Sequence, residues 1–171
     1  MAHVPPLDKS DASAEAQETL AAIENKLGGL PNFFKTAAHQ PDVLKGIATI
    51  DAGIKHDLPA KLRELAYFKA SQLNGCAYCM HYHKQAASGA GVSKEQLAEI
   101  DHHAGSGAFD EQEQAVLDYA EQLTRTANVE RSTVERLKTF LNDKQLVALA
   151  ATVALANFTN RLNHGLDIEL P

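Results

Sequence analysis

The residues of this chain best suited to chemistry are its only two cysteines, Cys76 and Cys79, and the histidine that follows them, His83. The cysteines lie three positions apart, and the histidine lies four positions beyond the second cysteine. Spacings of three and four place side chains on one face of an α-helix, so all three can share one surface if this segment is helical. A dithiol beside a base is typical of a redox centre or of half a metal site.

The position of the pair along its helix bears on which thiol is reactive. Gly75 favours the end of one helix, and the next is then predicted to begin at Cys76. The first turn of a helix has unpaired N–H groups and a partial positive charge, which can lower a cysteine pKa from about 8.5 to about 3.5–7.5. The helix terminus favours Cys76, whereas His83, one turn away, favours Cys79. These residues alone leave both assignments open.

Other uses of a Cys-x-x-Cys pair are haem attachment, zinc binding and core packing. Haem attachment requires a histidine directly after the second cysteine, and that position is Met80. A zinc site requires about four ligands, and the candidates are Cys76, Cys79, His81 and His83. On a helix, His81 would point nearly opposite to Cys79. Two buried, unreactive cysteines are the remaining alternative.

Glu64 is a further candidate, because it lies twelve residues before Cys76 in a run rich in apolar side chains. Taken alone, its spacing favours a solvated residue or an ion pair with Lys61, three positions earlier. We interpret the scattered histidines as surface or capping residues: His3, His39, His56, His102, His103 and His164.

The elements that position these residues are predicted to be helices throughout, which makes the fold class all-α. Alanine and leucine dominate, and no alternating strand pattern persists. The expected helices span residues 14–27, 31–38, 41–54, 57–74, 76–89, 93–103, 110–128, 132–141 and 142–164, after a loose arm at 1–12. Capping-box spacings are found at Ser93/Gln96, Asp110/Glu113, Ser132/Glu135 and Asn142/Gln145.

Length and composition predict one all-helical domain over residues 1–171, with a core of ordinary size. The net charge of −6 and the lack of a basic run argue against a nucleic-acid partner. No secretory signal is apparent, and the longest apolar stretch, 146–158, is too short to span a bilayer. We therefore expect a cytoplasmic protein with no membrane partner. In the cytoplasm, a lone cysteine pair is more often catalytic than structural.

The order Glu64, Cys76, Cys79, His83, with spacings of twelve, three and four, resembles the signature of the alkyl hydroperoxidase D family. That family is part of the carboxymuconolactone decarboxylase-like superfamily. The resemblance rests on Arg63-Glu64-Leu65-Ala66, Asn74-Gly75-Cys76-Ala77-Tyr78-Cys79-Met80-His81-Tyr82-His83, Ala86-Ala87 and Gly89. The resemblance covers about residues 41–125. We expect these residues to form the core of the domain, with N-terminal helices at 14–38 before it and C-terminal helices at 133–164 after it. Residues 30–34 and 157–164 resemble the peroxidase-related branch.

The resemblance implies an alkyl hydroperoxidase D-like helical bundle that reduces hydroperoxides through a dithiol–disulfide cycle. Cys79 would attack the peroxide and Cys76 would resolve the product. His83 would activate Cys79, and Glu64 would complete a proton relay. Tyr78 stands where well-studied members have a histidine; a phenol, with a pKa near 10, is a poor base at pH 7 but can hydrogen-bond.

The implied partners are a hydroperoxide substrate and a thiol- or lipoyl-bearing reductant protein, with no metal or other cofactor. The implied assembly is a homotrimer or homohexamer. Two alternatives remain. The decarboxylase branch of the superfamily lacks the dithiol, so the pairing of Cys76 with Cys79 argues against it. A zinc-binding or redox-sensing adaptor would use the same sulfurs without turnover, and about one zinc per chain would favour it.

Overall fold

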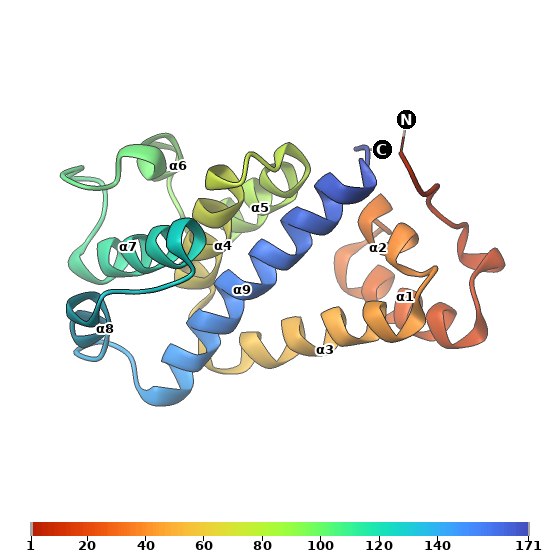
Figure 1. Ribbon diagram of the computed structural model, residues 1–171, viewed down its shortest axis with the longest axis horizontal. Helices are drawn as coiled ribbons and strands as arrows, with labels where there is room; N and C mark the ends of the chain where they lie inside the picture. Colours follow the sequence, from red (N-terminus) through yellow and green to blue (C-terminus); the bar gives the residue numbers. More distant parts are fainter. Residues whose placement is uncertain (1, 171) are drawn as a thin grey trace. The chain divides into compact units, whose positions relative to one another are not determined.

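The computed structural model describes residues 2–170, and every regular element in that range is a helix (Figure 1). The prediction of an all-α fold is therefore confirmed. In chain order, the elements are η1 (Lys9–Asp11), α1 (Ala14–Leu27), α2 (Asn32–Ala37), α3 (Pro41–Asp57), α4 (Ala60–Leu73), α5 (Ala77–Gly89), α6 (Lys94–Glu99), η2 (Ile100–His102), α7 (Glu111–Thr126), α8 (Arg131–Leu137) and α9 (Asp143–Leu166).

Three of the four predicted capping boxes are formed. At α6 and α7 the cap side chain accepts a backbone N–H three residues on, and that residue's side chain accepts the backbone N–H of the cap. The same two bonds, both 3.0 Å, join Asn142 and Gln145 at the start of α9. Each box pairs two backbone donors that would otherwise lack partners at a helix start, which is why the local signal succeeds at these positions.

The predicted box at Ser132 is wrong, because α8 begins one residue before it and has Glu130 as its N-cap. The cause is a contact from α7. The side chain of Gln122 accepts the backbone N–H of Glu130 at 2.9 Å and donates to Thr133 Oγ1 at 3.0 Å. This tertiary contact fixes the helix start where the neighbouring helix can reach it, and so overrides the local spacing.

Other predicted boundaries also differ: α3 continues to Asp57, three residues past its predicted end, and α8 ends at Leu137, four residues before its predicted end. The expected helix over 93–103 divides into α6 and the single 3₁₀ turn η2. In that turn, the Ile100 carbonyl oxygen accepts a hydrogen bond from the buried Lys69 ammonium at 3.1 Å. The arm at 2–12, expected to be loose, contains the 3₁₀ turn η1. Short 3₁₀ turns commonly end α-helices and connect elements, so neither change alters the helix order.

The described chain divides into two compact units. The first comprises the residues up to Ala52 together with those from Arg161 onward, and its apolar core joins α1, α2 and α3. The second, Gly53–Asn160, contains α4 to α8, most of α9 and every predicted site residue. The expected single domain over residues 1–171 stays a prediction, and its end residues 1 and 171 lie outside the described range.

Helix α4 is the central element of the second unit, where it packs against α5 and α7 (Figure 1). Its residues Leu62, Ala66 and Ala70 join one apolar cluster with α7 and α9, while Leu65 and Phe68 join a second cluster. Burial on several sides leaves little solvent for the charged residues of α4. Each buried charge on this helix must therefore find a protein partner, because unpaired buried charge is costly.

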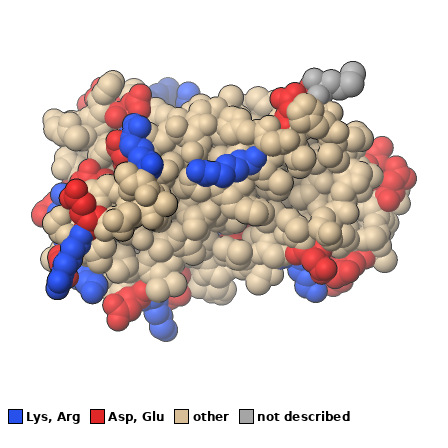
Figure 2. Space-filling model, viewed as in Figure 1, with Lys and Arg blue, Asp and Glu red and all other residues tan. Residues whose placement is uncertain are grey.

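Acidic and basic side chains are interspersed on the face shown in Figure 2, where most Lys and Arg residues lie beside acidic ones. Such a face offers no extended basic surface for a polyanion. Among residues 2–170, no helix has the length and apolarity needed to cross a membrane.

Candidate redox-active site

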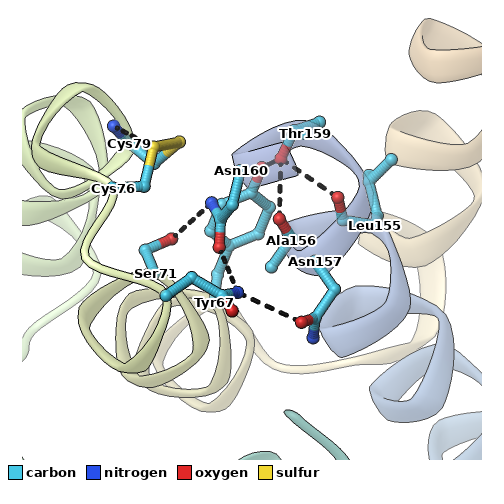
Figure 3. Close-up of a disulfide and its surroundings, with 10 residues drawn as sticks. Tyr67, Ser71, Cys76, Cys79, Leu155, Ala156, Asn157, Thr159 and Asn160 are labelled. Carbon is cyan, nitrogen blue, oxygen red and sulfur yellow. Dashed lines mark hydrogen bonds between the residues drawn. A yellow bond between two sulfur atoms is a disulfide. The ribbon is translucent and has the colours of Figure 1, made fainter. Parts of the chain in front are cut away.

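A disulfide joins Cys76 to Cys79 at the junction of α4 and α5 (Figure 3). Gly75 lies between the two helices with φ +66°, a left-handed conformation that glycine adopts without strain. The turn then brings the Cys76 N–H to the Ser71 carbonyl oxygen at 2.9 Å. The two cysteine Cα atoms are 5.3 Å apart, within the usual range for a disulfide.

Both sulfurs lie at the start of α5, as the sequence predicted. Cys76 is the N-cap residue, and its Sγ accepts the backbone N–H of Cys79 at 3.3 Å. The backbone N–H groups that point out of this end of the helix, and its partial positive charge, favour a thiolate once the disulfide is reduced. The residues are almost covered, with 1% of Cys76 and 4% of Cys79 exposed, although Gly75 and Ala77 beside them are exposed.

The imidazole of His83 meets the carboxylate of Glu64, with Nδ1 and Oε2 2.8 Å apart. Glu64 comes from α4 and His83 from α5, one helical turn after Cys79, so the contact spans both helices. The interpretation of Glu64 as a solvated residue or a partner of Lys61 is wrong. Only 7% of its side chain is exposed, and Lys61 pairs instead with Glu113 of α7.

Two opposing effects act on the pKa of Glu64. Burial is the largest and would raise it, but the hydrogen bond and charge of His83 lower it, as does the Arg63 guanidinium, whose Nε lies 3.2 Å from Oε1. The net result is a pKa below the ordinary value of 4.5. Glu64 is therefore a carboxylate at neutral pH, and it places a buried negative charge beside the imidazole.

Tyr67 is a site residue that sequence reasoning missed. Its ring stacks on the His83 imidazole, with centroids 3.5 Å apart and planes inclined by 13°. Its hydroxyl reaches α9, where it hydrogen-bonds the hydroxyl of Thr159 (Figure 3). The sequence could have indicated Tyr67 through its position three residues after Glu64, which places both side chains on one face of α4.

A network of amides and a hydroxyl links the cysteine-bearing turn to α9 (Figure 3). The Asn74 side chain donates to Asn157 Oδ1 at 3.1 Å and to Asn160 Oδ1 at 2.8 Å. Asn160 in turn donates to Ser71 Oγ at 3.1 Å, and both of these residues are fully buried. Because the polar groups satisfy one another, the network can lie inside the protein and hold the turn before Cys76 in place.

Tyr78 lies between the two cysteines and is buried, with its ring centroid 5.1 Å from that of Tyr82. His81 is exposed and contacts the ring of Tyr82 edge-on. The four zinc candidates therefore do not converge: among residues 2–170, no group of three or more His, Cys, Asp or Glu side chains is arranged to hold a metal ion.

The other histidines lie on the surface as predicted, with one exception. His103 is buried, and its Nε2 lies 2.9 Å from Asp118 Oδ1 on α7. His103 is the C-cap residue of η2, one of the two predicted roles, and Asp118, which also pairs with Arg136, provides a carboxylate partner for its buried side chain. This cluster does not include either cysteine, so we treat it as part of the helix packing.

Solved structures share this arrangement of helices over nearly the whole chain. An uncharacterized peroxidase-related protein of the alkylhydroperoxidase AhpD core, from Ralstonia eutropha JMP134, matches with a TM-score of 0.86 and 20% identity, over 99% of this chain and 92% of its own. A peroxidase-related protein from Silicibacter sp. TM1040 matches with a TM-score of 0.81 and 23% identity, over 96% and 90%.

A third structure has a different named activity. The debrominase Bmp8, solved as a cysteine-to-alanine variant with 2,3,4-tribromopyrrole, matches with a TM-score of 0.83 and 23% identity. The match covers 98% of this chain and 91% of the debrominase. At such identities these likenesses establish the fold, which is that of the alkyl hydroperoxidase D-like helical proteins.

Within that class, residues 41–122 match the model of the carboxymuconolactone decarboxylase family. The segment contains Glu64, Cys76, Cys79 and His83. The resemblance inferred from the order of those residues is therefore confirmed. No curated protein matches the chain.

Proposed function

We propose that this protein is a thiol-dependent peroxidase, or more broadly a disulfide oxidoreductase, that cycles between a dithiol and the Cys76–Cys79 disulfide. The observation that carries the proposal is the placement of this disulfide at a helix start, one turn before an imidazole held by a buried carboxylate. A reactive thiolate needs a nearby positive charge and a route for protons. His83 and Glu64 provide both.

The proposed reaction has three steps. The Cys79 thiolate attacks a hydroperoxide, ROOH, takes one oxygen to become a sulfenic acid, and releases ROH after His83 donates a proton to the leaving oxygen. The Cys76 thiol then displaces water from the sulfenic acid and forms the disulfide. An external dithiol reduces this disulfide by thiol–disulfide exchange and becomes a disulfide itself.

The assignment of Cys79 as the attacking residue follows from its relation to His83. The two lie four residues apart in α5, which places them on one face, whereas Cys76 lies at the cap. The substrate would be a hydroperoxide and the reductant a thiol- or lipoyl-bearing protein. The proposed assembly is a homotrimer or homohexamer, and the proposed compartment is the cytoplasm.

The test is a thiol titration before and after one equivalent of cumene hydroperoxide, with the reduced wild type and two variants. Both free thiols should vanish in the wild type. Cys76→Ser should leave a sulfenic acid that dimedone traps, and Cys79→Ser should be inert. Oxidation of Cys79→Ser at the wild-type rate would reverse the two roles, and a wild type that keeps both thiols would refute the peroxidase.

Reductive debromination is the second candidate, because the debrominase Bmp8 shares the fold over 98% of this chain. A dithiol can supply the two electrons that replace a carbon–bromine bond by carbon–hydrogen, with bromide released and the disulfide formed. Incubating the reduced protein with 2,3,4-tribromopyrrole, and measuring bromide against lost thiol, separates this reaction from peroxide reduction. One bromide per disulfide, with no peroxide-driven oxidation, would favour it.

A further inference from the structure

Two side chains of α4 hold the same imidazole from different directions. The Glu64 carboxylate meets Nδ1 of His83 in the plane of the ring, at 2.8 Å. Tyr67 covers the face of the ring, with centroids 3.5 Å apart and an interplanar angle of 13°. A hydrogen bond in the ring plane together with a stack on the ring face fixes both the position and the tilt of an imidazole.

The Tyr67 ring is itself anchored by its hydroxyl, which bonds Thr159 Oγ1. The Thr159 hydroxyl lies 3.0 Å from the Leu155 carbonyl oxygen and 3.1 Å from that of Ala156 (Figure 3). Carbonyl oxygens only accept, so a Thr159 O–H that donates to them leaves its oxygen able to accept from the Tyr67 hydroxyl. Rotating the tyrosine ring away would break the bond between Tyr67 and the buried Thr159.

We propose that Tyr67 is a positioning residue for His83. The ring face of Tyr67 stabilises the imidazolium that pairs with the Cys79 thiolate, and the hydroxyl of Tyr67 is anchored on Thr159. This inference rests on the proposed dithiol cycle, which it deepens by one residue. The faces of aromatic rings attract cations, and the attraction is greater where solvent is excluded. The Tyr67 face and the Glu64 carboxylate therefore contact the same imidazole from two directions.

The alternative is that Tyr67 only fills space between α4 and α9, since it also packs against the apolar cluster of the second unit. Four variants distinguish the two roles. Tyr67→Leu removes the ring, and Tyr67→Phe keeps the ring but removes the hydroxyl. Thr159→Val removes the acceptor, and Thr159→Ser restores it. Tyr119→Phe is the matched control, because Tyr119 is a buried tyrosine of α7 that lies outside the site.

The measurement uses reduced protein with Cys76→Ser throughout, so that Cys79 is the only thiol. The first readout is the rate of iodoacetamide alkylation between about pH 5 and pH 9, which follows the thiolate fraction. The second is the ring-current shift of the His83 ring protons in ¹H–¹³C spectra, with the signal identified from His83→Gln. The second readout reports the stack whether or not the protein reduces peroxides.

We expect Tyr67→Leu to abolish the ring-current shift, to move the alkylation profile to higher pH, and to slow alkylation at pH 7 by about three- to tenfold. Tyr67→Phe should keep most of the shift and show the same partial loss of rate as Thr159→Val, about twofold, because the ring face that supplies the attraction remains while the hydroxyl anchor is removed. Thr159→Val should show part of the loss, Thr159→Ser should recover it, and Tyr119→Phe should match the parent.

A Tyr67→Leu profile equal to that of the parent would overturn the inference, whether the ring-current shift is lost or kept. If Tyr67→Leu does not fold, equal profiles for Thr159→Val and Thr159→Ser would overturn the hydroxyl anchor. The expected changes in alkylation in a protein that no peroxide oxidises would support the role of Tyr67 while refuting the proposed peroxidase. A failure of the proposed role of Tyr67 can therefore be told apart from a failure of the proposed peroxidase activity.

Discussion

Replacing Glu64 by glutamine removes one negative charge from the site while keeping the shape of the side chain and an oxygen able to accept from His83 Nδ1. A hydrogen bond between charged partners contributes about 1.5–3 kcal/mol, against about 0.5–1.5 kcal/mol for a neutral one. The substitution should therefore cost about 1–2 kcal/mol of stabilisation of the imidazolium–thiolate pair. That corresponds to oxidation of Cys79 about 5- to 30-fold slower at pH 7.

The assay is stopped-flow oxidation of the reduced protein by cumene hydroperoxide, repeated between about pH 5 and pH 9, where a thiolate of lowered pKa titrates. The rate profile of Glu64→Gln should move to higher pH and approach the wild type in alkali, where the thiol ionises without help. Glu121→Gln is the matched control, because Glu121 is also a carboxylate with a lowered pKa beside a cation, Lys69, away from the sulfurs. A Glu64→Gln profile that coincides with the wild type would refute the relay.

The same substitution should change how stability depends on pH. The pKa of Glu64 lies below its ordinary 4.5 in the folded protein, since His83 and Arg63 outweigh the effect of burial. A lowered folded pKa stabilises the protein above the unfolded pKa, and this contribution is lost as the pH falls through the folded value. Glu64→Gln should therefore be less stable than the wild type at pH 7, with a gap that narrows below about pH 4.5. Urea unfolding at pH 7 and again below about pH 4.5 measures the difference in stability between the two proteins. A difference that does not change with pH would contradict a lowered pKa for Glu64.

Three further substitutions test the framework around the site. Gly75→Ala should cost about 1–2 kcal/mol in urea unfolding, because the residue has φ +66° and strain is the only penalty, with no atom within 4 Å of an added Cβ. Asn160→Ala should cost about 1–3 kcal/mol by removing its bonds to Ser71 and Asn74, and should speed labelling of reduced Cys76 by a bulky thiol reagent. Lys69→Met should cost about 1–3 kcal/mol by breaking the buried pair with Glu121, without changing the rate of peroxide oxidation.

Each of these has an outcome that contradicts it. An unchanged urea midpoint for Gly75→Ala would mean that the turn does not need the left-handed conformation. Labelling of Cys76 at the wild-type rate in Asn160→Ala would separate the amide network from the cysteine-bearing turn. Slower oxidation in Lys69→Met, at equal folded fraction, would place the Lys69–Glu121 pair in the redox chemistry.

The local part of the site was predictable from sequence, because helix spacing and one glycine determine it. Cys76, Cys79 and His83 belong to one helix and its cap, and Gly75 marks where that helix begins. The contact between Glu64 and His83 joins residues 19 positions apart on two helices, so no local rule predicts it. Local spacing favoured Lys61 as the partner, and only the family resemblance linked Glu64 to the histidine.

Long-range contacts also explain what the sequence did not reveal elsewhere. The start of α8 follows a side chain of α7, Gln122, rather than the nearby Ser132. The bond between Asn74 and Asn157 spans 83 positions, from the C-cap of α4 to the interior of α9. Asparagines that bond one another leave no periodic pattern in the sequence, so their pairing becomes visible only in three dimensions.

The burial of Cys76 and Cys79 limits which electron donors could reach their disulfide in the proposed cycle. An attacking thiolate must approach a disulfide sulfur directly, yet only 1% of Cys76 and 4% of Cys79 is exposed. A recessed thiol on a broad, rigid protein surface would reach such buried sulfurs less readily. A thiol on a long, slender arm, or a small diffusible dithiol, meets less obstruction. In the proposed cycle, the burial of the two cysteines therefore favours a donor whose thiol can reach them.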